Sequence, residues 1–153
     1  MEKMSFNFES IQKILIATDG SDCSWRAAEC GINIAKLLDA LVMVVYVIDD
    51  VVLDQVSKLT GLEQAERELK QNGERCINYV LGLARKEGVK EGRLLSKLAE
   101  GRPYDQIVHL AKEMNMDLIV IGTFGRIGSE GRLIGSVAER VIEYAPCPVL
   151  VVK

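Results

Sequence analysis

The sequence predicts an α/β protein built on a parallel sheet with helices on both faces. Two observations predict it. Five short apolar runs, most of them rich in β-branched residues, alternate with four longer stretches in which apolar residues recur at helical spacing. The fourth run then leads through a glycine-rich loop into a helix. An alternation of strand and helix favours parallel strands joined by right-handed crossovers.

The expected strands are short and apolar on both sides, as strands covered by helices are. They are residues 13–18, 41–48, 93–99, 118–121 and 149–152. The third of them carries Arg93, Ser96 and Lys97, so we expect it at an edge of the sheet. The segment 49–61 is a connection whose form the pattern leaves open.

Four helices are expected between the strands. The first ends near Leu38, with Ser21 or Asp22 as its N-cap and Trp25 in its apolar stripe. The second ends near Glu87, before Gly88. Its apolar face is expected to comprise Leu62, Ala65, Leu69, Cys76, Val80 and Leu83. The third has Pro103 in its first position and His109 on its surface, and the fourth starts at Ser136 with Val137, Val141 and Tyr144 facing inward.

Length and composition indicate one domain over residues 1–153, of which residues 1–11 are expected to form a flexible N-terminal arm. A net charge of −3 without a basic cluster argues against nucleic acid as a partner. No apolar run is long enough for a bilayer, and the N-terminus lacks a signal-like core, so a cytoplasmic location is expected. The four cysteines show no C-x-x-C spacing and are expected to be reduced, with no metal site.

The segment 119–136 carries the functional pattern. It contains Gly122-x2-Gly125-x9-Gly135-Ser136, between a strand and a helix N-terminus. Backbone N–H groups of such a loop, together with the helix dipole, make a phosphate cradle. The P-loop pattern does not fit, because no lysine lies between Gly135 and Ser136. The dinucleotide pattern does not fit either, because no two glycines are separated by a single residue.

This glycine spacing resembles the nucleotide loop of the universal stress protein family, in its ATP-binding branch. The resemblance covers residues 12–153. It implies a Rossmann-like sandwich of the adenine nucleotide alpha hydrolase-like type, with five parallel strands in the order 3-2-1-4-5. The switch point then lies between strands 1 and 4, where a ligand is expected beyond the carboxyl ends of the strands.

By the same resemblance the ligand is ATP, with or without Mg²⁺ or Mn²⁺. Asp19 would accept hydrogen bonds from the ribose, Val47 and Ile121 would border the base, and the glycines with Ser136 would bind the phosphates. The candidate binding residues are Ala17, Thr18, Asp19, Val47, Ile121, Gly122, Thr123, Gly125, Arg126, Gly135, Ser136 and Val137.

The chain departs from the family pattern at two places. Ala17 stands where the family often has proline, and Phe124 stands where it often has histidine. Alternatives also remain for single residues. Asp19 could serve only to cap the first helix, Arg126 and Arg132 could be ordinary solvated charges, and the loop could hold no ligand at all.

The residues offer little for catalysis, since His109 lies on the wrong helix and Ser136 has no general base nearby in the sequence pattern. We therefore expect a regulatory nucleotide-binding protein with at most slow hydrolysis. A nucleotide-independent interaction protein of the same fold is the alternative, and a slow ATPase or an adenylyl-transfer enzyme is a weaker one. The last strand would be an exposed sheet edge in a monomer. In the family it commonly pairs with its twofold mate, so a homodimer through residues 148–153 is expected.

Overall fold

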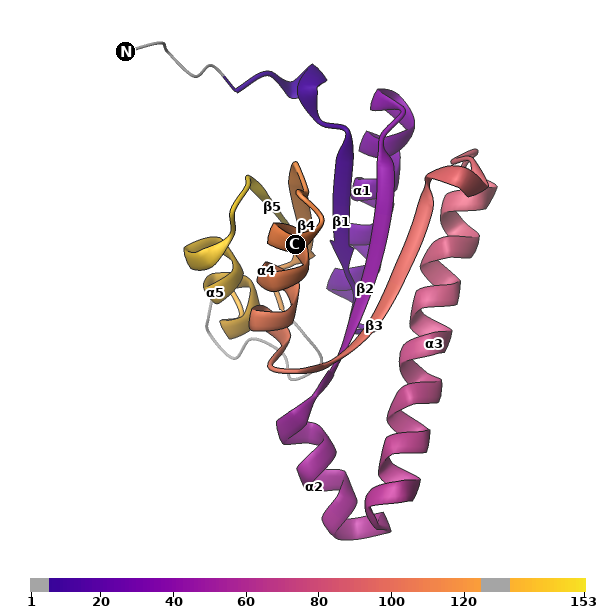
Figure 1. The fold of residues 1–153 in the computed structure, drawn as a ribbon, viewed down its shortest axis with the longest axis vertical. Coiled ribbons are helices and arrows are strands. Elements are labelled where there is room, and N and C mark those ends of the chain that lie inside the picture. The colour runs from indigo at the N-terminus through magenta and orange to yellow at the C-terminus, as the bar shows by residue number, and fades with distance from the viewer. Residues whose placement is uncertain (1–5, 125–132) are drawn as a thin grey trace.

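The computed structural model describes residues 6–124 and 133–153. Its centre is one parallel sheet with the strand order β3-β2-β1-β4-β5, which confirms the order expected from the resemblance (Figure 1). The third strand lies at an edge, as predicted. The strands are β1 (Lys13–Ala17), β2 (Leu41–Asp49), β3 (Leu94–Gly101), β4 (Leu118–Gly122) and β5 (Val149–Val152).

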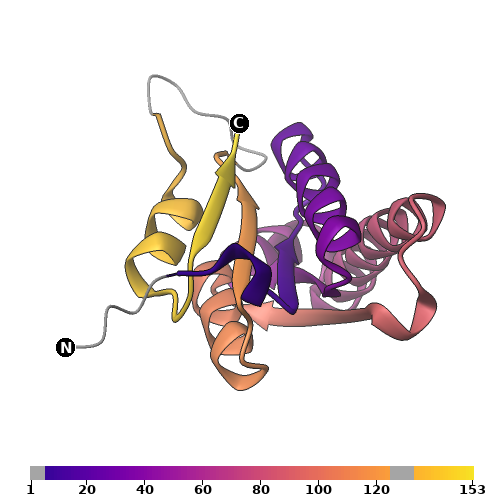
Figure 2. The same ribbon diagram turned by 90° about the horizontal axis from the view of Figure 1, so that it is seen from above.

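Helices cover both faces of the sheet, as expected for this class (Figure 2). They are α1 (Asp22–Leu38), α2 (Asp50–Thr60), α3 (Leu62–Lys86), α4 (Pro103–Glu113) and α5 (Ser136–Tyr144), with short 3₁₀ helices at Phe8–Ser10 and Glu91–Arg93. The predicted capping features are present. Ser21 is the N-cap of α1, Pro103 opens α4, and Gly88 follows the end of α3 with a φ of 97°.

Successive residues of the central strands point to opposite faces and build two separate cores. Ile14 and Ile16 of β1 pack with α1 and α3 on one face, whereas Leu15 and Ala17 pack with α4 and α5 on the other. All four side chains are at most 7% exposed. This double burial explains why the strand reads as a continuous apolar run rather than as an alternating one.

The segment whose form the sequence left open is the helix α2, which is capped by Asp49. The Asp49 Oδ1 atom accepts a hydrogen bond from the Val51 N–H group at 2.9 Å. Only Leu53 of this helix is buried. Figure 1 shows α2 and the start of α3 as a hairpin that extends beyond the ends of the strands.

One residue that was expected in the core is exposed because it belongs to this hairpin. Leu62, which was predicted on the apolar face of α3, is 57% exposed because it lies at the turn between the two helices. Farther along α3 the helix packs on the sheet, and there Gly73 has a packing role. A Cβ atom at Gly73 would lie 2.6 Å from Leu98 Cδ1 and 2.8 Å from Tyr46 Cδ1, so a larger residue would force these side chains to shift.

Three smaller differences concern single side chains. Ile11, which was expected in the flexible arm, is 1% exposed and belongs to the core, because the 3₁₀ helix before it brings the chain onto the sheet. Tyr144, which was expected to face inward, is half-exposed at the end of α5 and contacts the Tyr104 ring. Trp25 is half-buried, with its ring centroid 4.5 Å from that of Tyr79.

Candidate functional site

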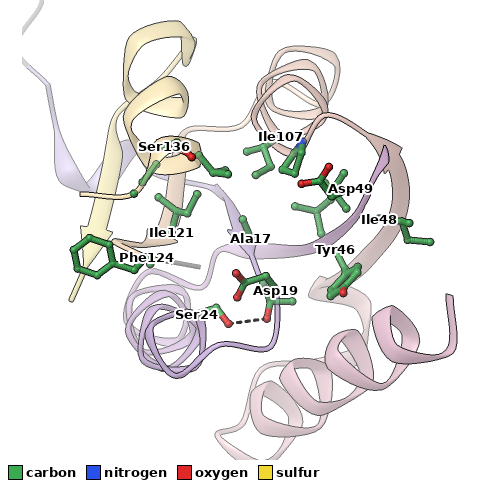
Figure 3. Close-up of a pocket in the computed structure, with 18 of the residues that line it drawn as sticks. Ala17, Asp19, Ser24, Tyr46, Ile48, Asp49, Ile107, Ile121, Phe124 and Ser136 are labelled. Carbon is green, nitrogen blue, oxygen red and sulfur yellow. Dashed lines mark hydrogen bonds between the residues drawn. The ribbon is translucent and has the colours of Figure 1, made fainter. Parts of the chain in front are cut away.

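A cavity of about 290 Å³ opens at the carboxyl ends of β1, β2 and β4, where the sequence predicts the ligand (Figure 3). Its size is near the lower end of small-molecule sites. The walls come from the sheet, from the starts of α1, α2, α4 and α5, and from the middle of α3. The lining residues are Ala17, Thr18, Asp19, Ser24, Val45, Tyr46, Val47, Ile48, Asp49, Val52, Leu69, Pro103, Ile107, Ile121, Gly122, Thr123, Phe124, Gly135, Ser136, Val137 and Ala138.

The fold brings the described candidate residues together around this one cavity. Those that line it are Ala17, Thr18, Asp19, Val47, Ile121, Gly122, Thr123, Gly135, Ser136 and Val137. Gly125 and Arg126 lie outside the described residues, and so does Arg132.

The end of β1 turns into α1 through a network of short hydrogen bonds. Asp19 Oδ1 accepts from the Ser21 N–H group at 2.9 Å, and Ser21 Oγ accepts from the Ser24 N–H group at 3.3 Å. The helix cap is therefore Ser21, whereas Asp19 fixes the turn that precedes it. Asp19 therefore is not the N-cap of α1, which was one role that the sequence left open for it. It lines the cavity instead.

The buried hydroxyl groups of Thr18 and Ser24 stabilise this turn through hydrogen bonds. Thr18 Oγ1 and Ser24 Oγ lie 3.2 Å apart, and the Ser24 hydroxyl also donates to the Ser21 carbonyl at 2.8 Å. Both residues are at most 5% exposed. Ser24 was not among the predicted site residues, although a serine three residues after a helix cap is a signal for such a bond.

The glycine-loop end of the cavity is built from close backbone contacts. A Cβ atom on Gly122 would lie 2.8 Å from the backbone carbon of Cys23, and one on Gly135 would lie 2.7 Å from the Thr123 carbonyl oxygen. The Gly135 N–H group donates to that same oxygen at 2.6 Å. Packing within the protein therefore requires glycine at both positions, whether or not a ligand is bound.

The helix α5 starts at this end of the cavity, and among the residues that the structure describes no side chain caps its first N–H groups. Its N-cap is Gly135, which makes no side-chain hydrogen bond, and Ser136 is exposed. The first turn of a helix has N–H groups without an intrahelical partner and a positive dipole end. Because Gly135, Ser136 and Val137 line the cavity, this end of it is suited to an anion.

The β2 end of the cavity is lined mainly by apolar side chains. Val47 comes from β2, Val52 from α2, Leu69 from α3, and Pro103 and Ile107 from α4. Of these, only Val47 was predicted. The others were missed because α2 was not recognised as a helix and because the fold brings α3 and α4 to the same opening. A flat apolar ring system fits such walls.

The charged side chains that line the described walls are two carboxylates. They are Asp19 at the end of β1 and Asp49 at the end of β2. Within residues 6–124 and 133–153, no group of three or more His, Cys, Asp and Glu side chains is placed to hold a metal ion. At the described walls, an anionic ligand would therefore contact the N-terminus of α5 and no lysine or arginine side chain.

All four cysteines are free thiols. Cys23 is closest to the site, with its Sγ atom 3.1 Å from Arg26 Nη2 and 3.7 Å from Thr123 Oγ1. Cys147 precedes β5, and burial together with the nearby Asp117 carboxylate raises the pKa of its thiol to about 11. His109 is at the surface, as predicted, with its Nε2 atom 4.0 Å from Glu113 Oε2.

None of the described helices combines the length and the hydrophobicity that crossing a membrane requires.

The chain is similar to known proteins over nearly its whole length. The model of the universal stress protein family matches residues 10–153. A universal stress protein of Methanocaldococcus jannaschii is 45% identical over 148 residues, which are 93% of this chain and 82% of that protein.

Solved structures show the same fold. The hypothetical protein MJ0577 superposes with a TM-score of 0.81 at 26% identity, over 94% of this chain and 96% of that one. A universal stress protein in complex with cAMP gives a TM-score of 0.62 at 28% identity, and one from Archaeoglobus fulgidus in complex with dAMP gives 0.66 at 25%. In both comparisons, 94% of this chain and 98% of the other are covered. The chain belongs to the universal stress protein family.

Proposed function

We propose that this protein binds an adenine nucleotide, ATP foremost, in the cavity at the ends of β1, β2 and β4, and acts as a regulatory module in a stress response. One observation carries the proposal. The uncapped N-terminus of α5 and the apolar walls at the end of β2 line opposite parts of one cavity. This combination suits a ligand with an anionic end and an aromatic end. Relatives solved with cAMP and dAMP support an adenine base.

Each part of the nucleotide has a proposed place. The phosphates lie against Gly135, Ser136 and Val137 at the start of α5, with further contacts from Gly125 and Arg126, which are outside the described residues. The ribose hydroxyl groups donate to Asp19 at the centre. The base lies between Val47 and the α4 side chains, with Ile121 bordering the middle of the cavity.

Hydrolysis is expected to be slow or absent. Among the described lining residues there is no histidine, lysine or cysteine that could act as a general base or stabilise a departing phosphate. Release of phosphate from ATP, followed with a coupled assay, should stay near the background rate. Rapid turnover that disappears in Asp19→Asn while binding persists would replace the regulatory assignment with an enzymatic one.

The proposal is tested with a variant that changes the charge at the phosphate position without disturbing the fold. In Ser136→Asp a carboxylate occupies the first turn of α5, where the dipole favours it, so the variant should fold. The same carboxylate repels phosphate. Calorimetry with Mg-ATP should show binding to the wild type and to Ser136→Ala, with at most a fewfold loss in the latter, and a loss of tenfold or more in Ser136→Asp.

Two results would count against the proposal. Equal affinity of Ser136→Asp and wild type for Mg-ATP would remove the phosphates from the start of α5. A wild-type protein that binds no adenine nucleotide at millimolar concentration would contradict the proposal as a whole, and the nucleotide-independent interaction protein would take its place.

We further propose a cytoplasmic homodimer. Among the described strands β5 pairs only with β4, and its residues are half-buried, so an apolar edge is left for a partner strand. The free thiols are consistent with a reducing compartment. Sedimentation at micromolar concentration should give twice the 16.9 kDa of one chain, and a species of 16.9 kDa alone would refute the dimer.

A further inference from the structure

The helix α2 contributes to the wall of the cavity and is itself held by few buried side chains. It packs against α3 and the end of β2, with Leu53 buried and Val56 half-buried. Figure 1 shows that α2 extends beyond the ends of the strands, so the sheet does not support most of its length. A segment that buries little apolar surface opens locally at a low cost in free energy.

Both ends of α2 are junctions at which the chain can change direction. At its start, Asp49 is the last residue of β2 and also the N-cap of the helix, so no loop separates the strand from the helix. At its end, Gly61 has a φ of 86°, and a Cβ atom added there would have nothing within 4 Å. Farther along, α3 is fixed to the sheet, where Asn72 Nδ2 donates to the Tyr46 hydroxyl oxygen at 3.2 Å. Movement of α2 can therefore leave the rest of the fold in place.

Val52 is the residue through which α2 lines the cavity. Its side chain is half-buried, yet among the described residues it packs with neither of the two hydrophobic cores. Leu53 and Val56 of the same helix do pack in the core that contains α1 and α3. An apolar ligand surface in the cavity would remove Val52 from water, and this burial would stabilise the position of α2.

The size of the cavity is a second reason to expect movement. At about 290 Å³ it lies at the lower limit of small-molecule pockets, so a nucleotide requires that a wall give way or that the ligand extend outward. Of the helices that line the cavity, α2 buries one residue, whereas α1, α3, α4 and α5 each bury two or more. Among these helices, α2 is therefore the one that can move at the lowest cost.

We propose that α2 is a lid, which moves to admit the ligand and then closes on it through Val52. The inference rests on the proposed function and deepens it, because it names the element by which binding changes the protein surface. A regulatory protein with slow hydrolysis requires such an element, since a nucleotide inside the cavity is otherwise hidden from other molecules. The lid comprises residues 50–61 and ends next to the exposed turn of the hairpin.

Hydrogen exchange of the whole protein, followed by mass spectrometry, tests the lid. Without ligand, the amides of residues 54–61 should exchange roughly a hundredfold faster than those of residues 73–86, which lie in the packed part of α3. Saturating Mg-ATP should slow the exchange of residues 54–61 by about tenfold. This is the size expected when a half-buried valine side chain becomes fully buried.

Two adjacent valines provide a matched pair of variants. Val52→Ala shortens the side chain that lines the cavity and introduces a good helix former, so the variant should fold. At saturating Mg-ATP the slowing in residues 54–61 should fall below about threefold in this variant. Val51 is 59% exposed and does not line the cavity, so Val51→Ala should keep the slowing of the wild type.

The outcomes separate this inference from the proposed function. If residues 54–61 exchange as slowly as residues 73–86 without ligand, α2 is fixed and the lid is wrong, whether or not a nucleotide binds. If Mg-ATP binds in calorimetry but leaves the exchange of α2 unchanged, the lid is wrong while the proposed function stands. Slowing of equal size in Val52→Ala and wild type would exclude closure through Val52. If Mg-ATP does not bind, the proposed function and the lid fall together.

Discussion

The two ends of the cavity are built in different ways. At the glycine-loop end, Gly122 and Gly135 form part of the wall and approach other backbone atoms so closely that a Cβ atom would collide with them. At the β2 end the walls are side chains contributed by β2, α2, α3 and α4. At the first end, the atoms proposed to bind the ligand are thus also required for folding, whereas at the second end a side chain can be exchanged while the backbone stays in place.

This difference decides which variants are informative. A substitution at Gly122 or Gly135 that abolishes nucleotide binding would not show that these residues contact the phosphate, because the fold itself requires them. Substitutions at Asp49 or Ser136 are cleaner, since they exchange one side chain for another at a half-buried and an exposed position. Under the proposed function, side chains at the β2 end could differ in their selectivity without any change at the start of α5.

The largest expected effect is at Gly122. In Gly122→Ala the new methyl group meets the backbone carbon and oxygen of Cys23 at 2.8 and 3.0 Å, and backbone cannot rotate aside as a side chain can. We expect the free energy of unfolding to fall by about 3 kcal/mol. Urea unfolding measures it, and a loss below about 1 kcal/mol would mean that β4 and α1 can separate easily.

A tightly packed glycine, Gly73, also lies near the β2 end. In Gly73→Ala the methyl group meets the side chains of Tyr46 and Leu98. Side chains can give way in part, so we expect a smaller loss of about 2 kcal/mol.

Gly82 on the same helix is the matched control, since a methyl group added there would have nothing within 4 Å. Gly82→Ala should raise the free energy of unfolding by up to about 1 kcal/mol through helix propensity alone. If both substitutions have the same sign in urea unfolding, the packing argument for Gly73 is wrong.

Variants of Asp49, the N-cap of α2, test whether a side chain at the β2 end can be exchanged without loss of stability. Asp49→Ala removes the acceptor for the Val51 N–H group and should cost about 1 kcal/mol. Asp49→Ser provides another capping oxygen and should be nearly neutral. Thermal unfolding of the two variants without ligand distinguishes them. Equal losses would mean that Asp49 stabilises the fold by more than its cap.

The smallest expected effect is at the start of α5. Without ligand, Ser136→Asp should stabilise the protein by about 0.5 kcal/mol, because its carboxylate lies at the positive end of the helix dipole. The gain, measured by thermal unfolding, should shrink at high salt. A destabilisation instead would indicate that the cradle is already electronegative without a ligand.

The strands and the glycine-loop end were largely predictable, because buried parallel strands and a strand–glycine–helix pattern leave local signals. Val47 and Asp19 were placed at the cavity through the strand order that the resemblance implied. The structure brings their strands together in that order.

The rest depended on contacts between distant segments. The helix α2 begins directly after β2, with Asp49 as both the last strand residue and the N-cap, so no separate turn marks it in the sequence, and Val52 was not among the predicted wall residues. The packing role of Gly122 arises from contact with Cys23, which is far away in sequence. No local pattern distinguishes a strand glycine that packs against a helix from a glycine that makes room for a ligand.

Under the proposed function, the two ends of the cavity together hold one adenine nucleotide. The most direct measurement is to denature freshly purified protein and identify any released small molecule by mass spectrometry, with Ser136→Asp purified in parallel. We predict ATP or ADP near one molecule per chain from the wild type and a marked depletion in the variant. A wild-type protein that releases no nucleotide and also fails to bind added Mg-ATP would contradict the account.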